Sequence, residues 1–364
     1  MYKVLHFGIC SSLGGIETYL LKIAKNIDRE KYKLNFLVVG KDEPCFYNEL
    51  NNLGCEFFFV ESRKKKYIKY IYELDKLFKN EKFDLVHCHL NSLKNISVVL
   101  MALKYGNKVI VHSRNGGGDF SLIENIINKI NYYILPRKKV KLLAVSNIAG
   151  QWMYGDEEDF TVINNSIEIE KYKFSNDKRA KIRKELSLED SKVIIHTGAF
   201  RKQKNHKFLI DIFNEVLKND SSYKLILIGK GPLEKDVINQ TKSYGIEDKV
   251  LFLGARNDIS ELLSSADIYL FPSLFEGFPN ALIEAESSGL PCLVSDSITN
   301  EVIVPNLCEV FSLKRFAKEW AEKLISIKIN NDRNYGMNYL KNNKLDINSE
   351  INKLDKIYEE VLEV

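Results

Sequence analysis

Two carboxylates flank a turn in the segment EGFPNALIEA, residues 276–285. Glu276 precedes a Gly-Phe-Pro turn, and Glu284 follows it within a short helical pattern. Carboxylates are favourable near a helix N-terminus because the helix dipole is positive there. The free N–H groups of the same helix end bind phosphate, and carboxylates accept hydrogen bonds from ligand hydroxyls. The segment therefore fits either a plain helix start or a site for a ligand that carries hydroxyls and phosphates.

A basic loop follows the apolar run KVIIHTG, which ends at Gly198. Four cations lie in this loop: Arg201, Lys202, Lys204 and Lys207. Charged side chains after a strand and before a helix are suited to neutralising a phosphate group. A solvated basic loop is the alternative interpretation.

Glycine-rich turns occur at two other strand-to-helix junctions. The sequence LGGIET (13–18) contains Gly15, and GKGP (229–232) opens another helical pattern. Glycine allows a backbone to approach a ligand closely, although a tight turn explains the same residues. Neither turn is a Gly-x-Gly-x-x-Gly fingerprint, so dinucleotide binding is not supported. The loop at 255–258 places Arg256 where it could pair with the edge of a heterocycle, and Asp258 is expected to be an N-cap.

The elements that position these residues alternate along the chain. Strands are expected at 3–8, 33–40, 55–60, 84–89, 108–113, 141–146 and 160–165, and again at 192–198, 224–230, 249–254, 267–273 and 291–296. Helical patterns at 17–27, 67–79 and 92–104 lie between strands of the first series. Continuous apolar strands that alternate with helices predict parallel sheets covered on both faces.

Two such series predict an α/β protein with two Rossmann-like, doubly wound domains. We expect the first domain to comprise residues 1–168 and the second 169–346. The helical segment 347–364 could pack on either domain and is assigned to the first. Ligands of open α/β sheets bind beyond the carboxyl ends of the strands, so two facing domains should enclose a cleft.

Overall composition excludes several classes of protein. The chain has 364 residues, 45% of them hydrophobic and 28% charged, with a net charge of only +4, so no nucleic-acid partner is expected. Six scattered cysteines form no Cys-x-x-Cys pair, which argues against structural zinc or a disulfide framework and fits a reducing cytosol. The first residues resemble no signal peptide, and no apolar run is long enough to span a membrane.

Five motifs in order resemble the family-4 retaining glycosyltransferases of GT-B fold, and in particular bacterial enzymes of capsular and extracellular polysaccharide synthesis. They are the N-terminal Gly-Gly-Ile-Glu (14–17), Gly-x-Phe-x-x-Gln-Lys-Asn (198–205), Gly-x-Gly-Pro (229–232), LGxRxDI (253–259) and Glu-x7-Glu (276–284). Each motif is weak alone, but the ordered set covers residues 4 to about 310. The resemblance implies a GT-B glycosyltransferase that binds a nucleotide sugar mainly through its second domain.

The resemblance also implies roles for individual residues. Glu276 would contact the donor sugar, Glu284 the ribose hydroxyls, and Lys204 the diphosphate. Gly15 would bring its amide to the leaving phosphate, and the backbone of Gly198 and the side chain of Arg256 would complete the donor site. Further donor contacts would come from the backbone of Gly277, Phe278, Pro279, Asn280, Ala281 and Leu282, with Asn280 as a plausible N-cap. Glu286 is expected to be only a helix surface residue.

Two positions depart from the family pattern. Ala199 stands where related enzymes carry an arginine, and Arg201 could reach the phosphates instead. Arg114 stands where many relatives have a histidine beside the donor sugar; it could stabilise charge but cannot act as a base, because guanidinium stays protonated. His112 is expected to pack within its strand. The catalytic set is therefore Glu276, Lys204, Arg201 and Arg114.

The implied mechanism needs no protein nucleophile, because the leaving phosphate accepts the proton of the acceptor hydroxyl. No Asp-x-Asp sequence occurs, so neither a metal nor any other cofactor is expected. The donor is expected to be a UDP-sugar. The alternatives are a GT-B nucleotide-sugar epimerase and a degenerate protein that binds a donor or a partner without turnover.

The acceptor is expected to be a glycan, carried on polyprenyl diphosphate. Residues 63–79 contain seven cations and two acids, and their apolar residues fall on one helical face. Such a helix could contact the inner face of the cell membrane. A domain helix that packs on its sheet with its lysines in water is the competing interpretation, and PRKKVK (136–141) could extend a basic patch. The expected location is cytoplasmic.

Overall fold

The structure is a computed structural model that describes residues 1–12, 14–117, 121–156, 158–165, 167–328 and 332–363. It divides into two compact units, one of Met1–Asn165 with Ile347–Val364 and the other of Ser166–Asp346. Leu13, in the predicted glycine-rich turn, and Val364, at the end of the last predicted helix, lie outside the described residues.

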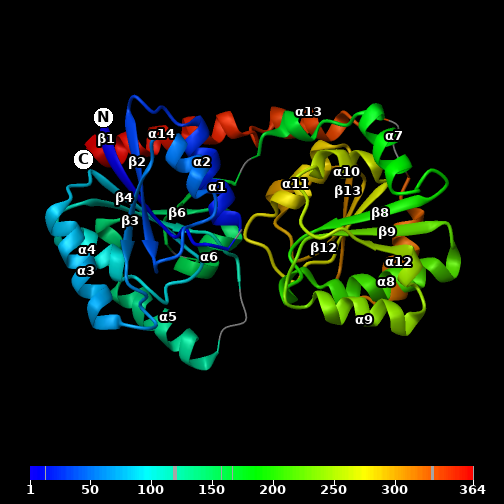
Figure 1. Ribbon diagram of the computed structural model, residues 1–364, viewed down its shortest axis with the longest axis horizontal. Helices are drawn as coiled ribbons and strands as arrows, with labels where there is room; N and C mark the ends of the chain where they lie inside the picture. Colours follow the sequence, from blue (N-terminus) through cyan, green and yellow to red (C-terminus); the bar gives the residue numbers. More distant parts are fainter. Residues whose placement is uncertain (13, 118–120, 157, 166, 329–331, 364) are drawn as a thin grey trace. The chain divides into compact units, whose positions relative to one another are not determined.

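The first unit is built on a parallel sheet with the strand order β3-β2-β1-β4-β5-β6-β7 (Figure 1). Its strands are β1 (Tyr2–Phe7), β2 (Tyr32–Val39), β3 (Glu56–Val60), β4 (Leu85–Leu90), β5 (Lys108–Ser113), β6 (Lys141–Ala144) and β7 (Thr161–Val162). Its helices are α1 (Gly15–Asn26), α2 (Tyr47–Asn52), α3 (Tyr67–Asn80), α4 (Ser97–Lys104), α5 (Leu122–Ile134), α6 (Asn147–Tyr154) and α14 (Ile347–Glu363). The order reverses direction between β1 and β4, which is where doubly wound sheets bind ligands.

Burial explains how these sequences form this sheet. Every residue of β4 is buried, as expected for a strand covered on both faces. In α3 the buried side chains are Tyr70, Leu74 and Phe78, which recur at helical spacing, so this helix does pack on the domain.

The C-terminal helix α14 belongs to the first unit. Ile351, Leu354 and Tyr358 join the core formed by α1, α2 and one face of the sheet. The Tyr32 hydroxyl donates a 2.6 Å hydrogen bond to Asp355, so polar contacts also hold the helix in place. The last residues of the chain thereby complete the core that its first residues begin.

The second unit contains a parallel sheet of order β10-β9-β8-β11-β12-β13. Its strands are β8 (Lys192–Thr197), β9 (Tyr223–Ile228), β10 (Val250–Phe252), β11 (Ile268–Phe271), β12 (Cys292–Ser295) and β13 (Cys308–Phe311). Its α-helices are α7 (Asn176–Glu185), α8 (His206–Asn219), α9 (Glu234–Tyr244), α10 (Ile259–Ser265), α11 (Asn280–Ser287), α12 (Ala317–Ser326) and α13 (Tyr335–Asn342). The prediction of two doubly wound parallel sheets is confirmed.

None of the helices in the described ranges is both long enough and apolar enough to cross a lipid bilayer.

Candidate active site

The carboxyl end of β8 carries a loop held by two glycine contacts. Gly229 has a φ of +141°, and a Cβ there would lie 2.1 Å from the carbonyl oxygen of Gly198. A Cβ on Gly231 would lie 2.5 Å from the carbonyl oxygen of Phe200. Only glycine permits this approach, so the Gly-x-Gly-Pro sequence locks two strand-end loops together.

Lys204 and Glu276, 72 positions apart in the chain, form an ion pair on this rim. The Lys204 Nζ lies 2.8 Å from Glu276 Oε1, and the two side chains are only 16% and 7% exposed. Lys204 comes from the short 3₁₀ turn Lys202–Lys204, and its Nζ lies 4.7 Å from the centroid of the Phe271 ring. Charges paired in so little water interact strongly, so the Lys204 cation is held in one position.

Gln203 fixes the second oxygen of Glu276, a role that the sequence motif did not reveal. Its Nε2 donates to Glu276 Oε2 and to the carbonyl of Phe275, each at 3.0 Å. The amide of Leu274 in turn donates to the carbonyl of Gln203 at 2.8 Å. The Gln-Lys pair in the motif 198–205 thus holds both oxygens of one carboxylate.

The turn after Glu276 leads directly into α11. Gly277, Phe278 and Pro279 are buried, while Asn280 and Ala281 are partly exposed at the first turn. The predicted N-cap is wrong: Pro279 occupies that position, and Asn280 is the first helical residue. The amide of Leu282 donates to the carbonyl of Pro279 at 2.9 Å, so this amide is used within the turn.

Glu284 is held by Tyr172, a residue that no motif indicated. The Tyr172 hydroxyl donates to Glu284 Oε1 at 2.9 Å from the 3₁₀ turn Ile169–Tyr172. Burial raises the pKa of Tyr172, and the adjacent Glu284 carboxylate raises it further, so this hydroxyl stays a donor. The first residues of the second unit therefore supply a side chain that holds a carboxylate of α11.

We expect Tyr172→Phe to raise the donor KM about five- to tenfold with little change in kcat, because one hydrogen bond that orients Glu284 is lost. Steady-state kinetics with varied donor would measure this. Tyr244→Phe is a matched control, because the Tyr244 hydroxyl donates to Asp211 at 2.8 Å on an exposed surface. Equal effects of the two substitutions would contradict the role of Tyr172.

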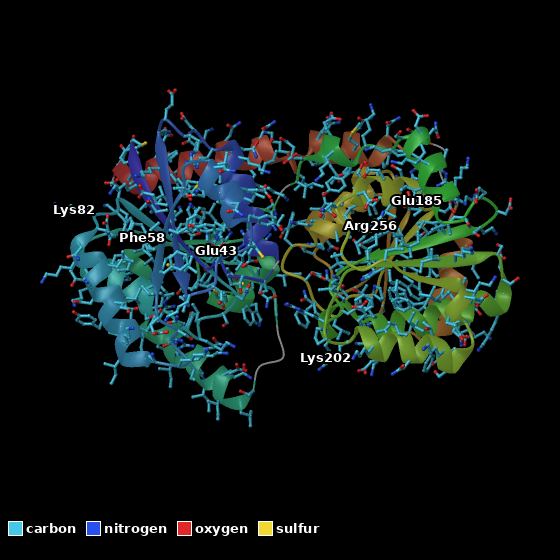
Figure 2. All side chains as sticks on the ribbon, in the orientation of Figure 1. Glu43, Phe58, Lys82, Glu185, Lys202 and Arg256 are labelled. Carbon is cyan, nitrogen blue, oxygen red and sulfur yellow. The ribbon has the colours of Figure 1, made fainter. Side chains whose placement is uncertain are left out.

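Arg256 is occupied by carboxylates in this structure. Its Nε and Nη2 bind the two oxygens of Asp258 at 2.8 and 2.6 Å, and Glu185 lies 3.8 Å away (Figure 2). Asp258 stands at the N-cap position of α10 but makes no side-chain capping bond. Arg201 and Lys202 are exposed on the β8 loop, where Figure 2 labels Lys202.

Glu286 is not a helix surface residue, so that prediction is wrong. Its side chain is fully buried, and Oε1 accepts a 3.0 Å hydrogen bond from the amide of Val304. Burial raises its pKa well above the usual range, because desolvation disfavours the charged form. Helical spacing alone could not show that a later segment, which contains Val304, packs on this side of α11.

Because the pKa of Glu286 is raised on folding, the native state binds a proton that the unfolded state releases, and stability should fall as pH rises above about 4.5. Glu286→Gln should therefore raise the free energy of unfolding by about 1–2 kcal/mol at pH 7, with the gain shrinking toward pH 4. Urea unfolding at several pH values would test this. Glu322→Gln, which alters a carboxylate 60% exposed, should change little.

In the first unit, the glycine-rich turn is held by Glu17. Glu17 Oε1 accepts a 3.1 Å hydrogen bond from the amide of Cys10, which fixes the loop between β1 and α1. Gly14 precedes α1, and a Cβ on it would lie 2.8 Å from Glu17 Oε2. Gly15 is different, because a Cβ there would have no neighbour within 4 Å. The backbone of Gly15 is therefore open to a ligand.

Arg114 follows β5 and is directed onto other side chains of the first unit. Its guanidinium lies 3.7 Å from the centre of the Tyr19 ring and donates to Asn165 Oδ1 at 3.1 Å. Burial raises the pKa of Tyr19; the Glu350 carboxylate of α14 raises it too, while Arg114 opposes this shift. Arg114 thus belongs to a buried cluster that includes the C-terminal helix.

Four histidines extend this cluster beneath α1. His6, His87, His89 and His112 are buried, and His6, His87 and His89 form the one metal-compatible group in the described residues, with ligand atoms within 4.8 Å. His6 Nδ1 lies 3.0 Å from His89 Nε2, and His87 Nε2 lies 3.1 Å from His112 Nδ1. Burial lowers the pKa of each ring, so neutral imidazoles that hydrogen-bond to one another account for the group.

Known proteins resemble both halves of the chain. The sequence profile of "Glycosyltransferase Family 4" matches residues 13–171, and that of "Glycosyl transferases group 1" matches residues 177–344. The chain is a family-4 glycosyltransferase with the GT-B fold. Its second half, which carries the Lys204–Glu276 pair, lies in the group 1 match.

Relatives of this glycosyltransferase align over most of its length. The Escherichia coli UDP-Gal:alpha-D-GlcNAc-diphosphoundecaprenol alpha-1,3-galactosyltransferase is 27% identical over 86% of this chain and 84% of its own. The Staphylococcus aureus capsular polysaccharide biosynthesis glycosyltransferase CapH is 25% identical over 98% of this chain and 99% of its own. Among solved structures, Anabaena HepE in complex with UDP matches with a TM-score of 0.82, 17% identity, and coverage of 99% and 100%. The GT-B fold expected from the sequence is confirmed.

Proposed function

We propose that this glycosyltransferase moves a sugar from a UDP-sugar to a hydroxyl of a glycan carried on polyprenyl diphosphate, with retention of anomeric configuration, in capsular or extracellular polysaccharide synthesis. The observation that carries the proposal is the Lys204–Glu276 pair at the end of β8, together with Glu284 of α11, which Tyr172 holds by a hydrogen bond. The UDP-galactose donor and diphosphoundecaprenol acceptor in the name of the Escherichia coli relative, and the UDP bound by HepE, support the donor and acceptor classes.

Each of these residues has a separate role in the proposed reaction. Lys204 leaves part of its contact with Glu276 to meet the diphosphate, and Arg201 adds a second cation. Glu276 accepts hydrogen bonds from the sugar, and Glu284 from the ribose. The bond from the anomeric carbon to the diphosphate breaks, and the bond to the acceptor oxygen forms on the same face. The acceptor proton passes to a departing diphosphate oxygen, so no protein base is required.

We propose that Arg114 and Gly15 of the first unit also act in the reaction. Gly15 offers an amide with open space beside it, and Arg114 carries a charge held by Tyr19 and Asn165. We place Gly15 next to the leaving phosphate and Arg114 next to the donor sugar. In this arrangement Arg114 stabilises developing negative charge and never accepts a proton.

A donor screen followed by product analysis tests the proposal. Thermal shifts with a panel of nucleotide sugars would identify the donor, and UDP release in the presence of a polyprenyl-diphosphate glycan would show transfer. Retention is checked by the anomeric proton coupling of the product in NMR. Conversion of the UDP-sugar without acceptor would instead show an epimerase, and donor binding without any turnover would show a degenerate protein. The family match and the named relatives favour the transferase over both.

Metal removal should leave the reaction intact. Lys204, Arg201 and the start of α11 supply the positive charge that a bridging cation would otherwise provide, so we expect EDTA to change the initial rate less than about twofold. The rate of UDP release with EDTA, and after addition of Mg²⁺ or Mn²⁺, would measure this. A loss restored only by a divalent cation would contradict the metal-free mechanism.

A further inference from the structure

Helix α5 exposes its apolar side to solvent. Its exposed large hydrophobic residues are Leu122, Ile123, Ile126, Ile127, Ile130, Tyr133 and Ile134, and the helix buries no residue at all. At 3.6 residues per turn these seven positions fall on one face about 140° wide. A helix of a globular protein normally turns such a face toward the core.

The polar side of α5 is the one that contacts the domain. Lys94 Nζ lies 2.8 Å from Glu124 Oε1, and Asn131 Nδ2 donates to the carbonyl of Leu93 at 2.6 Å. Glu124, Asn128, Asn131 and Tyr132 are the partly buried residues of the helix, and they lie opposite the apolar face. Hydrogen bonds therefore attach α5 to the first unit, which leaves its apolar face available.

Positive charge accompanies this face. The sequence has no acidic residue between Glu124 and Asp156, whereas it has five cations there: Lys129, Arg137, Lys138, Lys139 and Lys141. Two of the five, Arg137 and Lys141, pair with Glu158 and Glu360 from other segments. Lys129 stands at the edge of the apolar face, and Lys138 and Lys139 are exposed just after the helix. Such a combination matches the surface of a membrane that contains anionic lipids.

The beginning of α3 extends the same surface. Arg63 Nη1 donates to the carbonyl of Lys94, the residue that also pairs with Glu124 of α5. Near it, Tyr67, Ile68 and Tyr72 are exposed, with Ile68 at 85%. In Figure 1, α3 and α5 lie on the same side of the first unit's sheet. Tyr70, Leu74 and Phe78 of α3 are buried in the domain, so only the exposed residues of its first turns can contact a membrane.

We propose that α5, aided by the first turns of α3, inserts its apolar face into the headgroup region of an anionic lipid bilayer. A second copy of the chain would cover the same apolar face but would bring the exposed Lys129, Lys138 and Lys139 of two chains together, which repulsion opposes. A bilayer satisfies both the apolar face and the cations. The membrane contact itself does not depend on the proposed function. Only its purpose, to bring the site to a lipid-linked acceptor, rests on that function.

Vesicle sedimentation of the full chain tests the proposal without any substrate. The wild type should sediment with vesicles of phosphatidylglycerol and phosphatidylcholine and much less with phosphatidylcholine alone. The triple variant Ile123→Ser, Ile126→Ser, Ile130→Ser should bind the anionic vesicles at least about tenfold more weakly. It should keep the wild-type thermal transition, because the three side chains are exposed. Lys138→Glu with Lys139→Glu should also weaken binding, and this effect should disappear at high salt.

A control and the opposing outcomes complete the test. Val39→Ser, Leu53→Ser and Val310→Ser remove three exposed apolar side chains elsewhere and should leave vesicle binding unchanged. Unchanged vesicle binding by the α5 triple variant would overturn the proposal. So would a wild-type dimer that does not bind vesicles and that dissociates in the α5 triple variant. Donor turnover without vesicle binding would reject the membrane contact alone. Vesicle binding without turnover on any acceptor would reject the proposed function alone.

Discussion

Lys204→Met should reduce kcat/KM for the donor about 10²- to 10³-fold, the usual loss when one preorganised donor to a developing anion is removed. The Lys204 side chain runs past Gly198 and over the Phe271 ring; a Cβ built on Gly198 would lie 3.1 Å from its methylene carbons. Methionine keeps an unbranched side chain in this place. The substitution therefore removes mainly the charge. Steady-state rates of UDP release, with UDP affinity measured by calorimetry, would separate loss of binding from loss of turnover.

Lys207→Met is the matched control for Lys204→Met. Lys207 lies three positions further along, and its Nζ is 3.8 Å from Asp236 with the Lys207 side chain 62% exposed. We expect less than a twofold change, because exposed ion pairs contribute little. Lys207 lies in the first turn of α8, so similar losses in both variants would mean that this region acts only through its general positive charge, and the assignment of Lys204 would then be wrong.

Glu276→Gln should reduce kcat about 100-fold or more while the donor KM changes only a few-fold, because the interaction lost is one that strengthens during transfer. Glutamine keeps the shape of the side chain, but its NH₂ group cannot accept hydrogen bonds as carboxylate oxygens do. One of the two donors, Lys204 or Gln203, would then lose its acceptor. Single-turnover kinetics with saturating donor would measure the effect.

Two further variants show whether the effect of Glu276→Gln is specific to the Lys204–Glu276 pair. Glu309→Gln alters an ion-paired carboxylate 41% exposed on β13 and should leave the rate unchanged. In the double variant Lys204→Met with Glu276→Gln, the losses should be smaller than additive, because each side chain orients the other. Fully additive losses would show that the two groups act independently and would contradict the preorganised pair.

The closeness of the two motifs proposed for the donor site could be predicted from the sequence, because both follow the ends of parallel strands. Residues 198–205 and 276–284 follow β8 and β11, which are neighbours in the sheet, so their loops must lie at one edge. The pairing of Lys204 with Glu276 is a consequence of that adjacency. The roles assigned to these residues remain predictions.

Partners contributed from distant segments could not be predicted in the same way. Tyr172 reaches Glu284 across 112 positions, and Glu350 acts on Tyr19 from the other end of the chain. Neither contact has a local signature, since it depends on how turns and the C-terminal helix pack on finished units. The prediction for Glu286 was wrong for the same reason, because its burial depends on later segments that pack on α11, such as the one that contains Val304.

The sequence by itself determined the fold class, the two doubly wound sheets and the motifs that we propose for the donor site, because strand periodicity, helical spacing and glycine turns are local properties. Only the tertiary structure decided which face of each helix is buried. The apolar residues of α5 would serve equally well as a core face, and only the structure shows that Glu124 and Asn131 contact residues 94 and 93 while the apolar face stays exposed.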